Sequence, residues 1–238
     1  MVKLFLDSGH GGSDGGAVGM GLLEKNLTLE IAQGIADKLK DYEGIEVKMS
    51  RTSDKSLTLR QRTDEANAWG ADYFLSVHIN SAEDKTANGY EDFIYNGNVS
   101  SKTIALQNVI HDEIFKAIQP HGVSDRGKKR ANFHVLRETH CPAILTENLF
   151  IRNAADADRL KDATFKADLI QGHVTGLEKF LGLKKRQTEP PKMGATGGYI
   201  DGKLFKVQVG AFAERDNAEG LVKVLEASGF KGAFIVEE

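Results

Sequence analysis

Residues 73–79 read YFLSVHI, and this stretch decides the fold. It is rich in aromatic and β-branched residues, which is typical of a buried strand. Two further apolar runs, at 2–7 and 143–150, have the same character, and the first leads directly into a glycine-rich turn. Short apolar runs bounded by turns indicate central strands of a parallel sheet that is covered on both faces.

Helical patterns alternate with these strands. Apolar residues recur every four positions from Leu27 to Leu39, which predicts an amphipathic helix. A second helix is expected over 59–69, ended by Gly70. We therefore expect an α/β domain with a twisted, mostly parallel sheet flanked by helices. Further strands are predicted at 45–49, 90–95 and 133–136, and further helices at 104–118 and 165–180.

Composition excludes several classes of protein. The 238 residues carry a formal net charge of -3, which argues against a dedicated nucleic-acid-binding surface. A stretch of about 18 apolar residues, which a membrane span requires, does not occur. The single cysteine, Cys141, excludes an intramolecular disulfide and a cysteine-based metal site.

The composition of the sequence changes after Leu183. Residues 184–203 contain two adjacent prolines and several glycines without apolar periodicity, which indicates a linker. Beyond it, a strand at 205–209, a helix at 218–225 and a strand at 233–236 predict a small βαβ module. We therefore expect an α/β domain at 1–183, a linker at 184–203 and a small C-terminal βαβ unit at 204–238.

Polar side chains lie at the ends of the three central strands. His10 follows the first strand, His78 lies near the end of the second, and Glu147 lies within the third. Ligands of parallel sheets bind at the carboxyl ends of the strands, and Glu24 opens the helix that starts at this edge. Two imidazoles and one carboxylate form the shell of hydrolytic zinc sites. His10, Glu24 and His78 are thus candidate zinc ligands, and Glu147 is a candidate acid/base.

Other interpretations compete with a metal site. Histidines at strand ends are often structural, and spacing alone leaves the structural and metal-binding readings open. The glycine-rich loop could cradle a phosphate, but it lacks the G-x-G-x-x-G spacing and contains Asp14, which would repel a pyrophosphate. Cys141 and His140 point to opposite faces of an extended segment, so a thiol nucleophile paired with this histidine is disfavoured.

These motifs, taken in order, resemble the zinc-dependent N-acetylmuramoyl-L-alanine amidases of type 3, in particular those of Bacillus sporulation and of phage endolysins. The resemblance implies one Zn²⁺ ion bound by His10, Glu24 and His78, with Glu147 as the catalytic acid/base. It implies a peptidoglycan hydrolase that cleaves the amide between N-acetylmuramic acid and L-alanine of the stem peptide. The matching residues are 7–12, 24, 50–54, 59, 62, 66–67, 76–80, 125–128, 133–137 and 146–148.

Residues 205–212 are similar to one repeat of the SPOR-like modules that bind cell wall. Half a module leaves a strand edge uncovered, so we expect a homodimer paired through this segment. Docking of the tail on its own catalytic domain and a poorly ordered tail are the alternatives. Arg51, Arg62 and Asn67 are interpreted as residues that hold the fold. The N-terminus lacks a signal-peptide pattern, so we expect synthesis in the cytoplasm and action on the cell wall after lysis or pore-mediated release. A non-catalytic wall-binding protein is the alternative.

Overall fold

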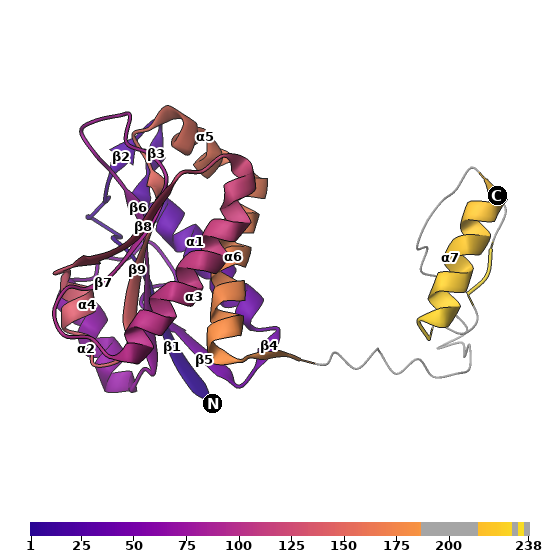
Figure 1. Cartoon of the computed structure of the whole chain (residues 1–238), viewed down its shortest axis with the longest axis horizontal. Helices are drawn as coiled ribbons and strands as arrows, with labels where there is room; N and C mark the ends of the chain where they lie inside the picture. Colours follow the sequence, from indigo (N-terminus) through magenta and orange to yellow (C-terminus); the bar gives the residue numbers. More distant parts are fainter. Residues whose placement is uncertain (187–213, 230–232, 236–238) are drawn as a thin grey trace. The chain divides into compact units, whose positions relative to one another are not determined.

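The computed structural model describes residues 1–186, 214–229 and 233–235 (Figure 1). The chain divides into two compact units, 1–186 and 187–238, which are treated separately below. The first unit is built on a six-stranded sheet. Its strands are β1 (Val2–Ser8), β5 (Ile45–Met49), β6 (Tyr73–Asn80), β7 (Tyr90–Tyr95), β8 (Asp125–Ala131) and β9 (Ala143–Phe150).

The strand order in this sheet is β5-β1-β6-β9-β7-β8. Strands β5, β1, β6 and β9 pair in parallel, as do β7 and β8, whereas β7 and β9 pair antiparallel. The prediction of a mostly parallel sheet flanked by helices is confirmed. The apolar runs at 2–7, 73–79 and 143–150 form β1, β6 and β9, which lie side by side at the centre of the sheet.

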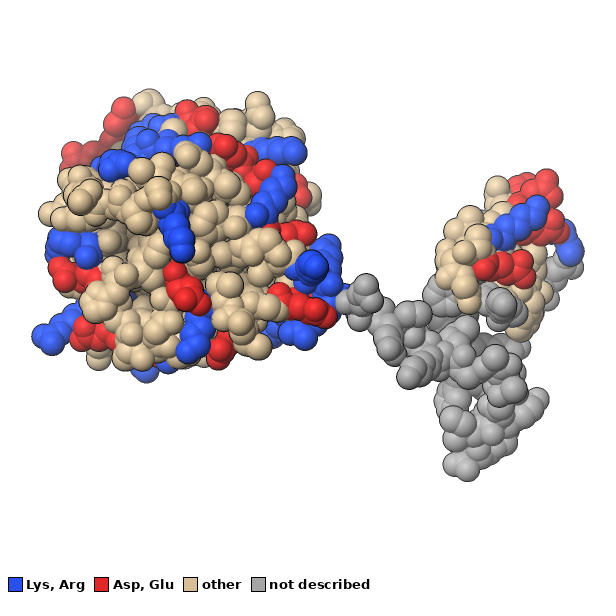
Figure 2. All heavy atoms as spheres, turned by 60° about the horizontal axis from the view of Figure 1, so that its bottom comes forward, with Lys and Arg blue, Asp and Glu red and all other residues tan. Residues whose placement is uncertain are grey.

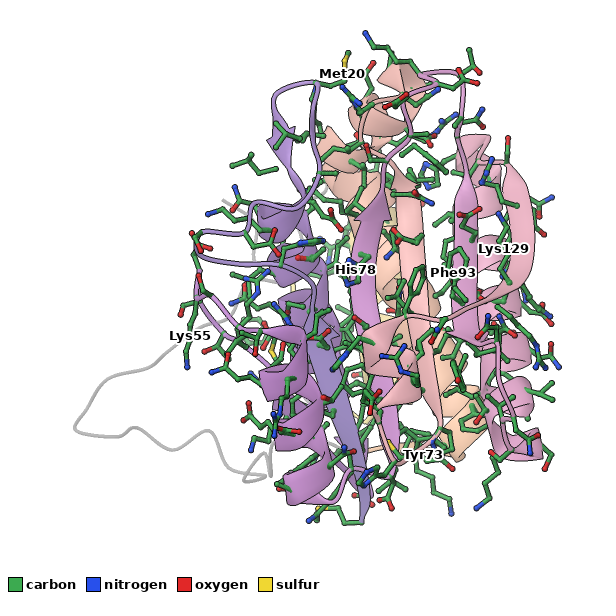
Figure 3. All side chains as sticks on the ribbon, turned by 90° about the vertical axis from the view of Figure 1, so that its left-hand side faces the viewer. Met20, Lys55, Tyr73, His78, Phe93 and Lys129 are labelled. Atoms are coloured by element: carbon green, nitrogen blue, oxygen red, sulfur yellow. The ribbon has the colours of Figure 1, made fainter. Side chains whose placement is uncertain are left out.

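The two faces of the sheet are covered unequally. Helices α1 (Glu24–Leu39), α3 (Ser101–Ile118) and α6 (Ala163–Leu181) bury the larger core cluster on one face. The short helices α2 (Leu59–Trp69) and α4 (His134–Arg137) bury the smaller cluster on the other. These two helices cover the half nearer Tyr73, and His78, Phe93 and Lys129 lie beyond them (Figure 3). His78, Phe93 and Lys129 are accordingly only partly buried.

Small elements complete the first unit. Helix α5 (Ala154–Lys161) packs on α6 and β9. Strands β2 (Val18–Gly19) and β3 (Leu22–Leu23) form a hairpin ahead of α1, and η1 (Gln119–His121) follows α3. Strand β4 (Tyr42–Glu43) pairs with β10 (Lys184–Lys185), and Arg186 donates to the Asp41 carbonyl. The predicted boundaries at 183 and 204 stay predictions.

Three parts of the sequence prediction were wrong or incomplete. Residues 133–136 were predicted as a strand, but Phe133 is the cap residue of helix α4 and residues 134–136 belong to that helix. The strand at this edge of the sheet is β8, which was not predicted because five of its seven residues are charged and it lacks an apolar pattern. Helix α5 was also missed, although Asn153 caps it by accepting from the Asp156 amide.

In the second unit, the structure describes helix α7 (Arg215–Ala227), which confirms the predicted helix. The strand predicted at 205–209 lies outside the described residues. Residues 233–235 form no strand in the part that is described, so the second predicted strand of this module was wrong there.

The charged side chains of the first unit are mixed in sign. On the face shown in Figure 2, basic and acidic side chains are interspersed over the surface. The whole chain is likewise close to balanced, with a formal net charge of -3. Among the described residues, no helix is both long and apolar enough to cross a bilayer.

Candidate functional site

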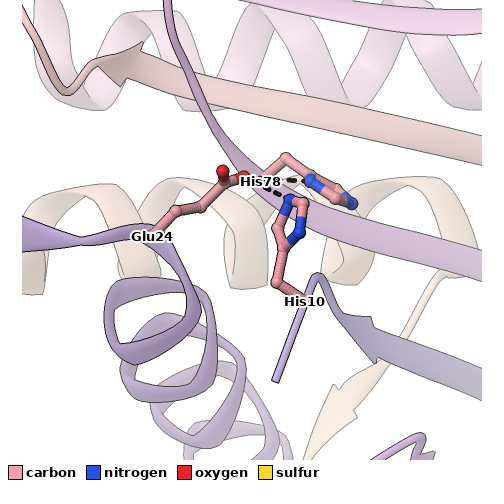
Figure 4. Close-up of side chains that lie close together, drawn as sticks. All are labelled: His10, Glu24 and His78. Atoms are coloured by element: carbon pink, nitrogen blue, oxygen red, sulfur yellow. Dashed lines mark hydrogen bonds and ion pairs between the residues drawn. The ribbon is translucent and has the colours of Figure 1, made fainter. Parts of the chain in front are cut away.

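His10, Glu24 and His78 come together although they lie far apart in the sequence. One ligand atom from each lies within 4.8 Å of the others. His10 Nε2 lies 3.1 Å from Glu24 Oε1, and His78 Nδ1 lies 3.0 Å from the same oxygen (Figure 4). His10 follows β1, Glu24 is the first residue of α1, and His78 lies on β6. The adjacent parallel strands β1 and β6 thus deliver both imidazoles to one edge, as the sequence suggested.

The glycine-rich loop after β1 packs tightly against these side chains. A Cβ on Gly16 would lie 2.6 Å from Glu24 Oε2 and 2.7 Å from the His10 ring, and Gly16 has a positive φ of 63°. A Cβ on Gly9 would collide with the His78 ring. Glycine is required at both positions because any side chain would displace the three candidate ligands.

The orientation of His10 is set by Asp14. Asp14 Oδ2 lies 2.9 Å from His10 Nδ1, which leaves Nε2 facing Glu24. Histidines that ligate metals commonly place their second ring nitrogen on a carboxylate in this way. The sequence analysis considered Asp14 only as a carboxylate that would repel a pyrophosphate. Its position four residues after His10 was the available signal for this supporting role.

The electrostatics of Glu24 fit a cation site. Its Oε1 accepts from the Ile79 amide at 3.0 Å and its Oε2 from the Ala17 amide at 2.7 Å. Burial raises the pKa of this carboxyl, but the hydrogen bonds and charges of His10 and His78 outweigh burial and hold the pKa well below its usual range. A buried, ionised carboxylate beside two imidazoles is a donor set that suits a divalent transition metal.

Two buried arginines hold the backbone that carries His10. Arg62 donates to the carbonyls of Ser8 at 2.6 Å and His10 at 2.7 Å, and to Asp7 Oδ1 at 2.7 Å. Arg51 donates to the carbonyls of Ser8, Gly9, Ser53 and Lys25. The Asn67 side chain joins the Glu138 carbonyl and the His140 amide. All three residues hold the fold, as the sequence analysis expected.

Glu147 lies on the strand next to His78. The register of β6 and β9 places Glu147 opposite His78, and the register of β7 and β9 places it opposite Glu91. Its Oε2 is buried and has no hydrogen-bond partner among the described residues. Burial, followed by the charges of Glu24 and Glu91, raises the pKa of Glu147 well above its usual range. A carboxyl group in this environment holds a proton more readily than an exposed one, which suits a group that receives and passes on a proton.

Glu91 is a functional candidate that the sequence analysis missed. It is buried, and it accepts hydrogen bonds from Asn80 Nδ2 at 2.7 Å, from Arg126 Nε at 2.6 Å and from Lys129 Nζ. Burial raises its pKa, but Lys129 and Arg126 outweigh burial and lower it. The available signal was the alternation in this strand, where Glu91 lies on the same face as the aromatic residues Phe93 and Tyr95.

A cavity of about 220 Å³ adjoins two of the candidate ligands, His10 and His78. It lies between the glycine-rich loop and the start of α2, and its walls include His10, His78, Thr58 and Leu59. A larger hollow of about 710 Å³ between α1 and β5 contains none of the candidate site residues. The smaller cavity is therefore the one that can hold part of a substrate next to the cluster.

Comparison with known proteins identifies the first unit. Residues 4–179 match the family described as N-acetylmuramoyl-L-alanine amidase, and residues 201–238 match the SPOR domain. The chain is 45% identical over 239 residues to the sporulation-specific N-acetylmuramoyl-L-alanine amidase of Bacillus subtilis, covering 100% of this chain and 86% of that protein. It is 37% identical to the endolysin of Bacillus phage SPP1, covering 98% of this chain and 84% of that protein.

A solved structure agrees with these sequence matches. The catalytic domain of CwlV, an N-acetylmuramoyl-L-alanine amidase from Bacillus (Paenibacillus) polymyxa var. colistinus, superposes with a TM-score of 0.72 at 35% identity. The match covers 77% of this chain and 100% of that domain. The fold, the matched residues and the overall similarity point to the same group of enzymes: this chain belongs to the N-acetylmuramoyl-L-alanine amidase family.

Proposed function

We propose that this amidase works with one zinc ion bound by His10, Glu24 and His78, and that Glu147 is its catalytic acid/base. The enzyme is a peptidoglycan hydrolase that cleaves the amide between N-acetylmuramic acid and L-alanine of the stem peptide. The observation that carries the proposal is the meeting of two imidazoles and one ionised carboxylate within 4.8 Å. On the strand next to His78 lies Glu147, whose Oε2 is buried and has no hydrogen-bond partner in the described part of the chain.

Each of these side chains has a separate task. When bound, zinc supplies Lewis-acid chemistry, since it polarises a carbonyl and makes a water more acidic. Glu147 accepts a proton from the attacking water and then donates this proton to the alanine nitrogen as the C–N bond breaks. Asp14 keeps His10 Nε2 turned toward Glu24, and Arg62 holds the His10 backbone in place. The products are a free muramic lactyl carboxylate and a peptide with a free N-terminal alanine.

Removal of the metal tests the proposal directly. Elemental analysis of the purified protein should find about one zinc per chain, and incubation with cell wall should release new N-terminal alanine. Chelation should abolish the release, and added Zn²⁺ should restore it, because structural and catalytic zinc sites bind reversibly. A His78→Ala variant should lose zinc. Alanine release that survives complete metal removal would contradict the proposal, and a protein that binds cell wall but releases no alanine would be a non-catalytic binder.

The SPOR-matching segment supports targeting to cell wall, and pairing of two such segments is a separate prediction. Full-length protein should behave as a dimer in light scattering at micromolar concentration, whereas a chain truncated after residue 186 should be a monomer. The reason is that the segment that matches the SPOR domain, residues 201–238, is too short to bury a stable core alone, and a second copy would supply the missing apolar surface. A monomeric full-length protein under these conditions would remove the predicted homodimer.

A further inference from the structure

The candidate active-site residues form one row across the sheet. The paired registers place His78 on β6 opposite Glu147 on β9, and Glu147 opposite Glu91 on β7. Two cations from the next strand, β8, complete the row, because Arg126 and Lys129 both contact the Glu91 carboxylate. The row therefore runs from the candidate metal ligands, through the acid/base, to a pair of cations at the sheet edge.

This row fixes the direction in which a substrate lies. The proton carried by Glu147 goes to the leaving nitrogen, so the nitrogen side of the scissile amide must face Glu147. The acyl side must then lie toward β1, where the 220 Å³ cavity lined by His10 and Thr58 adjoins the cluster. The peptide that starts at the nitrogen must run the other way, over β7 toward β8. This direction rests on the proposed role of Glu147.

Arg126 and Lys129 pair with Glu91 but remain partly exposed, so both can also donate to a substrate. The Arg126 side chain is 33% exposed and the Lys129 side chain is 35% exposed, whereas Glu91 between them is 6% exposed. Two positive charges face one carboxylate, so the end of the row has an excess of positive charge. Lys129 Nζ also lies 5.9 Å from the Phe93 ring, which packs against the partly exposed ring of Phe133. An exposed cation beside an aromatic surface suits a peptide carboxylate with an alkyl part next to it.

We infer that Lys129 and Arg126 form a subsite for a carboxylate of the stem peptide, on the second residue after the scissile amide. Neighbouring strands lie about 4.8 Å apart, so the cations that reach back to Glu91 lie one to two strand spacings from Glu147. An extended chain advances about 3.5 Å per residue, which brings a group on the second residue to that distance. A D-glutamate linked through its side chain presents a free α-carboxylate there.

The test compares two synthetic N-acetylmuramoyl peptides that differ in one group. Both begin with L-alanine and continue with a side-chain-linked D-glutamate, whose α-carboxyl group is free in one peptide and amidated in the other. We expect the zinc-loaded full-length enzyme to cleave the free acid with a kcat/KM about tenfold higher, mainly through KM, because the charge-assisted hydrogen bond to Lys129 is lost with the amide. A Lys129→Met variant should lose this preference, and Lys129→Arg should keep most of it.

Lys128→Met is the matched control. Lys128 lies on the same strand with a side chain of similar exposure, 31%, but its Nζ contacts Asp112 on the α3 side of the sheet, 2.8 Å away. This variant should keep the preference for the free acid within about twofold, since a surface ion pair contributes little. Equal cleavage of both peptides by the wild-type enzyme, or an equal fall for both peptides in Lys129→Met, would overturn the subsite. Absence of alanine release from either peptide and from cell wall would instead refute the proposed function, and the subsite with it.

Discussion

A Glu147→Gln variant is expected to lose roughly 10²- to 10⁴-fold in kcat, the range that general acid/base groups contribute. Glutamine matches the size of glutamate but cannot carry a proton from the water to the leaving nitrogen. Its zinc content should equal that of the wild-type protein, because the candidate ligand cluster does not include Glu147. The measurement is the rate of N-terminal alanine release together with elemental analysis of the same sample.

Stability separates loss of chemistry from loss of fold in this variant. Burial and the charges of Glu24 and Glu91 disfavour the ionised form of Glu147, so a neutral amide should not lower the Tm. Glu46→Gln is the matched control, because Glu46 is an exposed residue of β5, at the sheet edge opposite β8. Its activity should equal that of the wild-type protein. Full activity in Glu147→Gln, or loss of zinc from it, would contradict the role assigned to Glu147.

The central part of the fold could be predicted because burial imposes a readable pattern. Strands β1, β6 and β9 are apolar runs since both of their faces are covered, and α1 shows its buried stripe at Leu27, Ile31 and Ile35. The candidate ligands were found for the same reason. His10 and His78 interrupt or follow apolar strands, where an unpaired polar side chain would be costly.

The edge of the sheet could not be predicted because its stability comes from tertiary contacts. Strand β8 is charged along most of its length, and it is held by pairing with β7 and by ion pairs such as Lys129–Glu91. The run 133–136 has strand-like residues, but Phe133 instead precedes a single helical turn whose Val135 and Leu136 fill the smaller core. The proximity of Glu91 to Glu147 was also missed, because it depends on the order of the strands rather than on local sequence.

An Arg62→Met variant is expected to lose about 3–5 kcal/mol of unfolding free energy, the usual effect of breaking a buried ion pair from one side. Arg62 and Asp7 are almost fully buried. Besides Arg62, the Asp7 carboxylate accepts a hydrogen bond from the Ser76 hydroxyl at 2.7 Å, so Arg62 is the cation that balances its charge. Urea denaturation with the wild-type protein as reference measures the loss. Arg60→Met, on the exposed face of the same helix, removes only the surface pair with Asp64 and should stay within about 0.5 kcal/mol.

The pH dependence of this loss identifies Asp7 as its cause. In the wild-type protein burial raises the pKa of Asp7, but the charge and hydrogen bond of Arg62 outweigh burial and lower it. The pair therefore stabilises the fold fully above the unfolded-state pKa of about 3.9, and this stability is lost as the pH falls through the lower folded-state pKa. Without Arg62, burial should raise the Asp7 pKa, so the variant gains a proton on acidification. The difference in unfolding free energy should be largest near pH 7 and shrink toward pH 4, and adding Asp7→Asn should recover part of it. A difference that is constant with pH and unaffected by Asp7→Asn would show that lost packing and carbonyl hydrogen bonds at Ser8 and His10, rather than the unpaired charge, dominate.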